Sequence, residues 1–79
     1  IVPMILSPAT AQVLTTEDRQ FTAYGGFGTY TYALDVNESG GSIDSMTGVY
    51  TAGVTTPATD VIEVTDAQGN TATSTVTVV

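Results

Sequence analysis

The 79-residue sequence contains no cysteine and no histidine, and these two absences remove much of the chemistry that small proteins use. Without cysteine the chain has no disulfide and no thiolate that could attack a substrate or bind a metal. Without histidine it lacks the usual general base and the commonest metal ligand. A serine–histidine–aspartate arrangement is therefore impossible, and we predict that the chain is not an enzyme.

Positive charge is almost absent, because Arg19 is the one basic residue beside eight acidic residues, which gives a net charge of −7. Nucleic acids and anionic lipids bind proteins through clustered Lys and Arg, so we exclude nucleic-acid binding. The lack of lysine also excludes an intramolecular isopeptide crosslink, which joins Lys to Asn or Asp. High negative charge is expected to keep the chain soluble.

Long apolar runs are missing as well. The longest, Ile1–Leu6, contains Pro3 and is far shorter than the ~20 residues of a membrane-spanning helix, so we expect no membrane insertion. It also has no basic segment or cleavage site of a signal peptide. The chain begins abruptly with Ile-Val-Pro, and we expect residues 1–79 to be a single domain taken from a longer protein with many repeats.

What the sequence does contain is alternation of apolar and polar residues, which places every second side chain on one face of a strand. The last twenty residues predict a terminal β-hairpin, with Ile62 and Val64 on one face of its first strand. The turn lies at Asp66–Asn70, which is rich in turn-forming residues. One face of the second strand is formed by Ala72, Ser74, Val76 and Val78.

Similar short runs cover most of the remaining chain. No window has helical periodicity, and turn residues separate the runs at short intervals. The pattern predicts an all-β protein, a two-layer sandwich of about seven antiparallel strands with Greek-key connections. The other predicted strands cover residues 1–6, 11–14, 19–24, 29–36, 42–44 and 49–52.

Three segments carry a resemblance to a known family: residues 21–34 (Phe21-Thr-Ala-Tyr-Gly-Gly, then Thr29-Tyr-Thr-Tyr-Ala-Leu), residues 41–53 (Gly-Ser-Ile-Asp-Ser-Met-Thr-Gly-Val-Tyr-Thr-Ala-Gly) and residues 64–78. In order and spacing they resemble the repeated immunoglobulin-like domains of large bacterial surface and secreted proteins. The resemblance covers most of the chain from about residue 18. It implies an immunoglobulin-like sandwich without catalytic residues, repeated in tandem, with neighbouring repeats as its partners.

The primary interpretation is therefore a non-enzymatic extracellular structural or interaction module, a spacer or stalk repeat of a bacterial surface or secreted adhesin-like protein. One alternative is a ligand-binding module, either calcium-dependent or carbohydrate-binding. Another is a phage-virion decoration domain of the same fold.

Acidic residues near the turns form the candidate metal site. Calcium takes six to eight oxygen ligands from carboxylates, amides and carbonyls. Asp60, Asp66 and Asn70 are the candidate ligands, with calcium as the one candidate cofactor; apart from calcium we expect no cofactor. The interpretation that we favour is that Asp66 and Asn70 make turn hydrogen bonds to backbone amides, as Asp and Asn commonly do.

Aromatic residues form the second candidate site. Tyr24 and Phe27 lie beside glycines, and we predict that they are exposed, which makes them the candidate residues for binding a surface glycan or a protein ligand. Tyr30 and Tyr32 are expected in the core instead, because a chain without Trp has few other large side chains to fill its interior.

Overall fold

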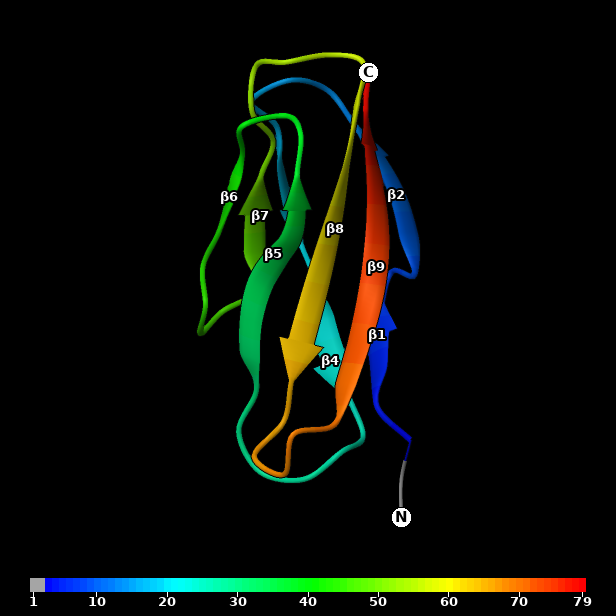
Figure 1. The fold of residues 1–79 in the computed structure, drawn as a ribbon, viewed down its shortest axis with the longest axis vertical. Helices are drawn as coiled ribbons and strands as arrows, with labels where there is room; N and C mark the ends of the chain where they lie inside the picture. Colours follow the sequence, from blue (N-terminus) through cyan, green and yellow to red (C-terminus); the bar gives the residue numbers. More distant parts are fainter. Residues whose placement is uncertain (1–2) are drawn as a thin grey trace.

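Two layers of β-strands face each other in the computed structural model, which describes residues 3–79 (Figure 1). This part of the chain is strand and turn throughout, so it contains no helix that could span a membrane. The first two residues of the strand expected over 1–6 lie outside the described residues. One layer is a four-stranded sheet in the order β2 (Thr10–Val13), β9 (Thr71–Val78), β8 (Ala58–Thr65) and β5 (Thr31–Asn37).

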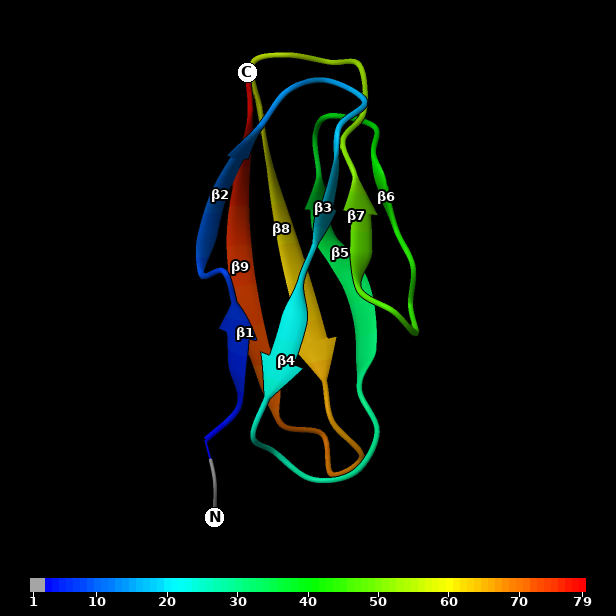
Figure 2. The same ribbon diagram turned by 180° about the vertical axis from the view of Figure 1, so that it is seen from behind.

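The second layer has its own central strand, which is broken into β3 (Asp18–Gln20) and β4 (Thr22–Tyr24) at Phe21 (Figure 2). β4 pairs with β1 (Ile5–Ser7), while β3 pairs with β7 (Val49–Thr51). β7 pairs in turn with β6 (Ser42–Ile43). The connections from β4 to β5 and from β7 to β8 cross between the layers, as Greek-key connections do.

Residues 3–79 form nine strand segments, and the sequence predicts separate strands over residues 1–6 and 11–14. The segments make about seven strands, as predicted, if β1 with β2 and β3 with β4 are each counted as one broken strand. The first of these changes layer near Pro8, so that β1 pairs antiparallel with β4 whereas β2 pairs parallel with β9. This parallel pair departs from the antiparallel pairing that we expected. Its physical reason is that β2 keeps the direction of β1 when it joins the other sheet, and β9 runs in that same direction.

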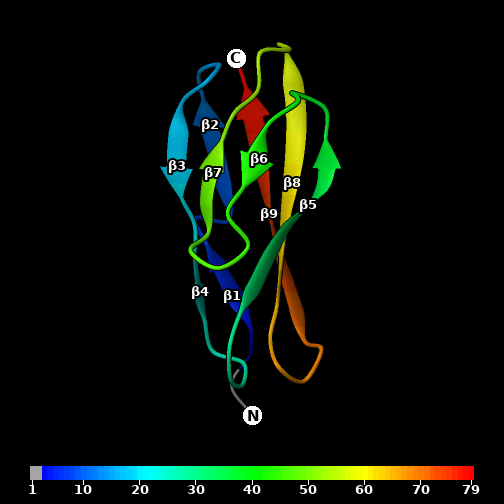
Figure 3. The same cartoon turned by 90° about the vertical axis from the view of Figure 1, so that its left-hand side faces the viewer.

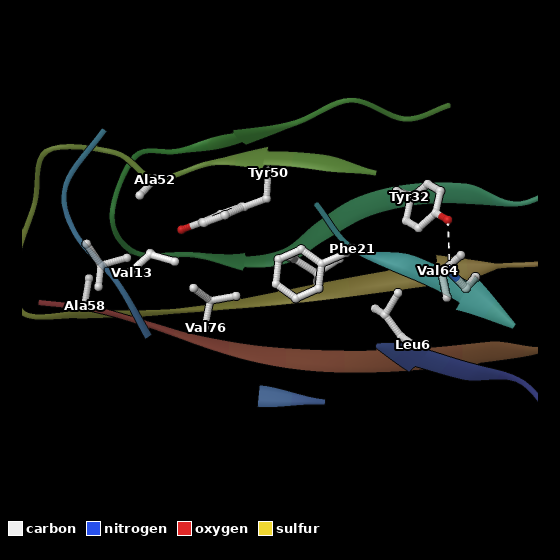
Figure 4. Packing of buried hydrophobic residues seen from close by; sticks show 12 residues of the cluster. Leu6, Val13, Phe21, Tyr32, Tyr50, Ala52, Ala58, Val64 and Val76 are labelled. Carbon is white, nitrogen blue, oxygen red and sulfur yellow. Dashed lines mark hydrogen bonds between the residues drawn. The ribbon is translucent and has the colours of Figure 1, made fainter. Parts of the chain in front are cut away.

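The alternating side chains fill the space between the layers (Figure 4). Phe21 and Tyr50 are fully buried and pack edge to face, with ring centroids 6.1 Å apart. Tyr32 is buried as predicted, and its hydroxyl accepts a hydrogen bond from the Ala23 backbone N–H (3.1 Å). The hairpin contributes the inward row that the sequence predicted, which consists of Ile62, Val64, Val76 and Val78.

The sandwich is elongated, with principal extents of 38 × 18 × 17 Å. Figures 1 and 3 show that the first described residues and the C-terminus lie at opposite ends of the long axis. We name these the N-terminal end and the C-terminal end. The N-terminal end is formed by connections 25–30 and 66–70, and the C-terminal end by connections 14–17, 38–41 and 52–57.

Candidate functional site

Asp60 lies in β8 and is fully buried near the C-terminal end. Its carboxylate accepts hydrogen bonds from the backbone N–H groups of Glu38 (2.7 Å) and Ser39 (3.0 Å). It also accepts the hydroxyl groups of Ser39 (2.5 Å) and Tyr50. These four residues, which we name the Asp60 clamp, fasten the β5–β6 connection and β7 onto β8.

All four hydrogen bonds that Asp60 accepts come from neutral groups, so the charge is stabilised by dipoles and not by a cation. Burial raises the pKa of Asp60, but the hydrogen bonds from Ser39, Tyr50 and Glu38 outweigh it and hold the pKa below its ordinary value. Burial and the adjacent carboxylate raise the pKa of Tyr50 to about 12. At neutral pH the clamp therefore consists of an ionised aspartate and a protonated tyrosine.

Asp66 follows the last residue of β8, at the N-terminal end. Its carboxylate accepts hydrogen bonds from the backbone N–H groups of Gln68 (2.9 Å) and Asn70 (2.8 Å), and from the Asn70 side-chain amide (2.9 Å). It also accepts the backbone N–H of Phe27 (2.9 Å) from the β4–β5 connection. These residues form the Asp66 clamp. The amide of Asn70, followed by the backbone donors, outweighs burial and lowers the pKa of Asp66.

Two glycines let the connections of the N-terminal end approach each other closely. Gly26 and Gly28 both have positive φ, a conformation that favours glycine. A Cβ on Gly26 would lie 2.7 Å from an Asp66 carboxylate oxygen, and one on Gly28 would lie 2.6 Å from the Cβ of Ala67. Phe27 stands between them, and its carbonyl accepts the backbone N–H of Ala67 (2.9 Å). The backbone of Phe27 is thus held on both sides.

The predicted metal ligands do not come together in one place. Asp60 and Asp66 are six residues apart along an extended segment, which is roughly 20 Å, whereas Asn70 lies against Asp66. β8 runs without interruption between the two aspartates and therefore keeps them at opposite ends. Within residues 3–79, no group of three His, Cys, Asp or Glu side chains is arranged to hold a metal ion. Calcium binding stays a prediction.

The predicted aromatic residues lie toward the N-terminal end and are exposed, as expected: the exposed fraction is 56% for Tyr24 and 62% for Phe27. Tyr24 pairs across β1 and β4 with Ile5, which is also exposed. Tyr30 is half-buried, and its hydroxyl donates to the carbonyl of Gly25 (2.6 Å). The attachment of Phe27 to Asp66 was not predicted, because 39 residues separate the two and no local pattern signals the contact.

No family model and no curated protein matches this chain. Among solved structures it is similar to the C-terminal 282-residue fragment of intimin, determined in complex with the intimin-binding domain of the translocated intimin receptor. The TM-score is 0.75 at 22% identity, over 92% of this chain and 29% of that chain. The likeness shows the fold, and the predicted immunoglobulin-like β-sandwich is confirmed.

Proposed function

We propose that this chain is a non-enzymatic structural module, a spacer or stalk repeat of a bacterial surface or secreted adhesin-like protein, located outside the cell. The observation that carries the proposal is the position of the first described residues relative to the C-terminus. They lie at opposite ends of a 38 Å axis, so each domain joined in series adds its long dimension to the array (Figure 3). A stalk needs this arrangement, whereas adjacent ends would fold successive domains back on each other.

The structural comparison supports a place within a longer chain. This chain spans less than a third of the intimin fragment that it matches, so there the same fold is one part of a larger protein. That fragment was determined in complex with a receptor domain, which is consistent with a role in adhesion. We propose neighbouring repeats as the partners of this chain.

The hydrogen-bond clamps supply the stiffness that a spacer needs. A domain of 79 residues without cysteine has a thin core and no crosslink to reinforce it. The Asp60 clamp and the Asp66 clamp join connections at the two ends of the long axis. The ends, where force enters and leaves a stalk, are therefore the places where side chains tie the backbone together.

Small-angle X-ray scattering on two copies joined directly, Val79 to Ile1, tests the proposal. We expect a maximum dimension close to twice that of the single chain measured in the same buffer. A two-copy protein whose maximum dimension stays close to that of one copy would have its domains packed side by side, and the spacer function would be wrong.

A ligand-binding module is the second candidate, and the exposure of Tyr24 and Phe27 is the observation that favours it. Sugars stack on exposed aromatic rings, and a fixed backbone lowers the entropic cost of binding. Nuclear magnetic resonance titration with the neutral oligosaccharides cellotetraose and chitotetraose tests this function. Binding would shift the amides of residues 24–28 in the unmodified chain and would leave them unshifted in Phe27→Ala.

A further inference from the structure

We propose that the two ends of this domain are complementary, so that the N-terminal end of one copy docks on the C-terminal end of the copy that precedes it in series. The inference rests on the proposed spacer function, because it requires domains joined one after another. It adds a specific contact at each joint, with Phe27 as its anchor. The occupant of the N-terminal end is a second copy of this chain.

Phe27 has the properties of an anchor residue. Its side chain is 62% exposed, while its N–H is bound by Asp66 and its carbonyl by Ala67. The backbone is therefore ordered before any partner arrives, which reduces the entropy lost on binding. Rigid, exposed aromatic residues are common among the few residues that carry most of the binding energy at interfaces.

The N-terminal end is also the place where one acidic copy can approach another. Within connections 25–30 and 66–70, Asp66 is the only charged residue. Asp66 is only 6% exposed, and its carboxylate accepts four hydrogen bonds. The chain carries a net charge of −7, so repulsion between copies is weakest where no charge is exposed. A docking surface between identical acidic domains is expected at such an end.

The C-terminal end exposes apolar side chains. Leu14, Val54 and Val79 are exposed by 61%, 76% and 44%, and each belongs to a different segment. These segments are hydrogen-bonded to one another through Val79 N–H to the Val13 carbonyl (2.9 Å), Thr16 N–H to the Gly53 carbonyl (3.2 Å) and the Thr56 hydroxyl to the Val78 carbonyl (3.1 Å).

Acidic side chains accompany these apolar side chains, since Glu17 and Glu38 lie in connections of the same end. Two C-terminal ends would therefore repel each other. The uncharged N-terminal end avoids that repulsion, and connection in series brings it to the C-terminal end of the preceding copy. A head-to-tail contact does not close on itself and can recur at every joint of an array.

The short link between copies brings the two surfaces together. In the two-copy protein used below as the test, Val79 is joined to Ile1, so three residues precede Met4 of the second copy, and they span at most about 10 Å. Such a tether gives an effective concentration on the order of millimolar or higher. A contact too weak to form between separate molecules is therefore populated within the two-copy protein.

The test compares the same substitution made in the first copy and in the second copy of the two-copy protein. Phe27→Asp in the second copy places a charge at the joint, whereas Phe27→Asp in the first copy places it at the free end and serves as the matched control. Val54→Asp is tested in the same way. In the first copy it lies at the joint, and in the second copy it lies at the free end and serves as the control. Nitrogen-15 relaxation of each copy measures whether the two domains tumble together, and thermal unfolding of the single-chain variants checks that both still fold.

We expect the unmodified two-copy protein and both free-end variants to tumble as one body. Both joint variants should lose this common tumbling, with the correlation time of each copy falling toward that of the single chain. Independent tumbling in an extended, unmodified two-copy protein would overturn the inference and leave the spacer function intact. Equal behaviour of the joint and free-end variants would also overturn it. A compact two-copy protein in scattering would instead contradict the spacer function.

Discussion

Asp60 and Asp66 lie at opposite ends of β8, and each fastens segments that are distant in the sequence, but the two clamps differ in depth. Asp60 is fully buried and binds Ser39 and Tyr50, which are fully buried as well. Asp66 is slightly exposed, and its donors lie in connections near the surface. The Asp60 clamp is continuous with the core through the packing of Tyr50 on Phe21, whereas the Asp66 clamp positions an exposed loop.

This difference separates two roles that aspartate fills, one within β8 and one directly after it. Removing a carboxylate from the core leaves buried donors without an acceptor, which affects the whole domain. Removing one from a surface connection frees a loop and leaves the core in place. We therefore expect the C-terminal clamp to govern stability and the N-terminal clamp to govern how Phe27 is presented.

The largest effect is expected from Asp60→Asn, which places an amide N–H₂ group near the donors of Ser39 and Tyr50. The free energy of unfolding should fall by about 3 kcal/mol, because buried hydrogen bonds to a charged acceptor are lost and the new amide N–H₂ group lies against the hydrogen-bond donors of Ser39 and Tyr50. Urea unfolding measures the change, with Asp35→Asn on the exposed side of β5 as the matched control. A loss below about 1 kcal/mol would mean that the clamp does not stabilise the core.

A smaller effect is expected when the two connections of the N-terminal end are forced apart. Gly28→Ala adds a Cβ 2.6 Å from that of Ala67 and should cost about 2 kcal/mol of unfolding free energy. Gly40→Ala is the control, since Gly40 also has positive φ but a Cβ there meets no atom within 4 Å. If the two variants lose equal stability in urea, the approach of the two connections is not what holds the N-terminal end.

The free energy of unfolding should depend on pH through different residues in the acid and alkaline ranges. The pKa of Asp60 is lowered in the folded state, so its stabilisation is complete above the unfolded pKa of about 4 and is lost as pH falls through the folded pKa. The pKa values of Asp44 and Asp66 are lowered too, so Asp60→Asn should weaken the acid dependence without abolishing it.

On the alkaline side, the pKa of Tyr50 is raised to about 12, so its stabilisation is complete below about pH 10 and is lost as pH rises through 12. Urea unfolding at pH values between 2 and 12 measures both ranges. Tyr50→Phe should reduce the loss of stability at alkaline pH. Identical alkaline slopes for this variant and the unmodified chain would place the titrating group elsewhere.

The smallest effect is expected from calcium. The carboxylates of Asp60 and Asp66 each accept four hydrogen bonds and lie at opposite ends of β8, so the clamps need no ion to balance them. We expect the same midpoint of thermal unfolding in millimolar calcium and in EDTA. A site of ~10⁻⁴ M affinity would raise the midpoint by several degrees in calcium, and such a rise would restore the metal-site prediction.

Local patterns predicted much of this fold, because alternation reports directly on which side chains face the core. The hairpin, the inward row of β9 and the exposure of Phe27 all follow from neighbours in the sequence. The clamps do not, since 21 residues separate Ser39 from Asp60 and the two meet only when the layers close. The parallel pairing of β2 escaped prediction because it depends on the change of layer near Pro8.

Hydrogen exchange of individual amides in the native state tests the central contrast between the two clamps most directly. We predict that the amides of Glu38 and Ser39, bound to Asp60, exchange only with global unfolding, whereas that of Phe27, bound to Asp66, exchanges faster through local opening. In Asp66→Asn, exchange at Phe27 should accelerate while the Ser39 amide keeps the rate set by global unfolding. Equal protection at both ends, lost together in that variant, would contradict the account.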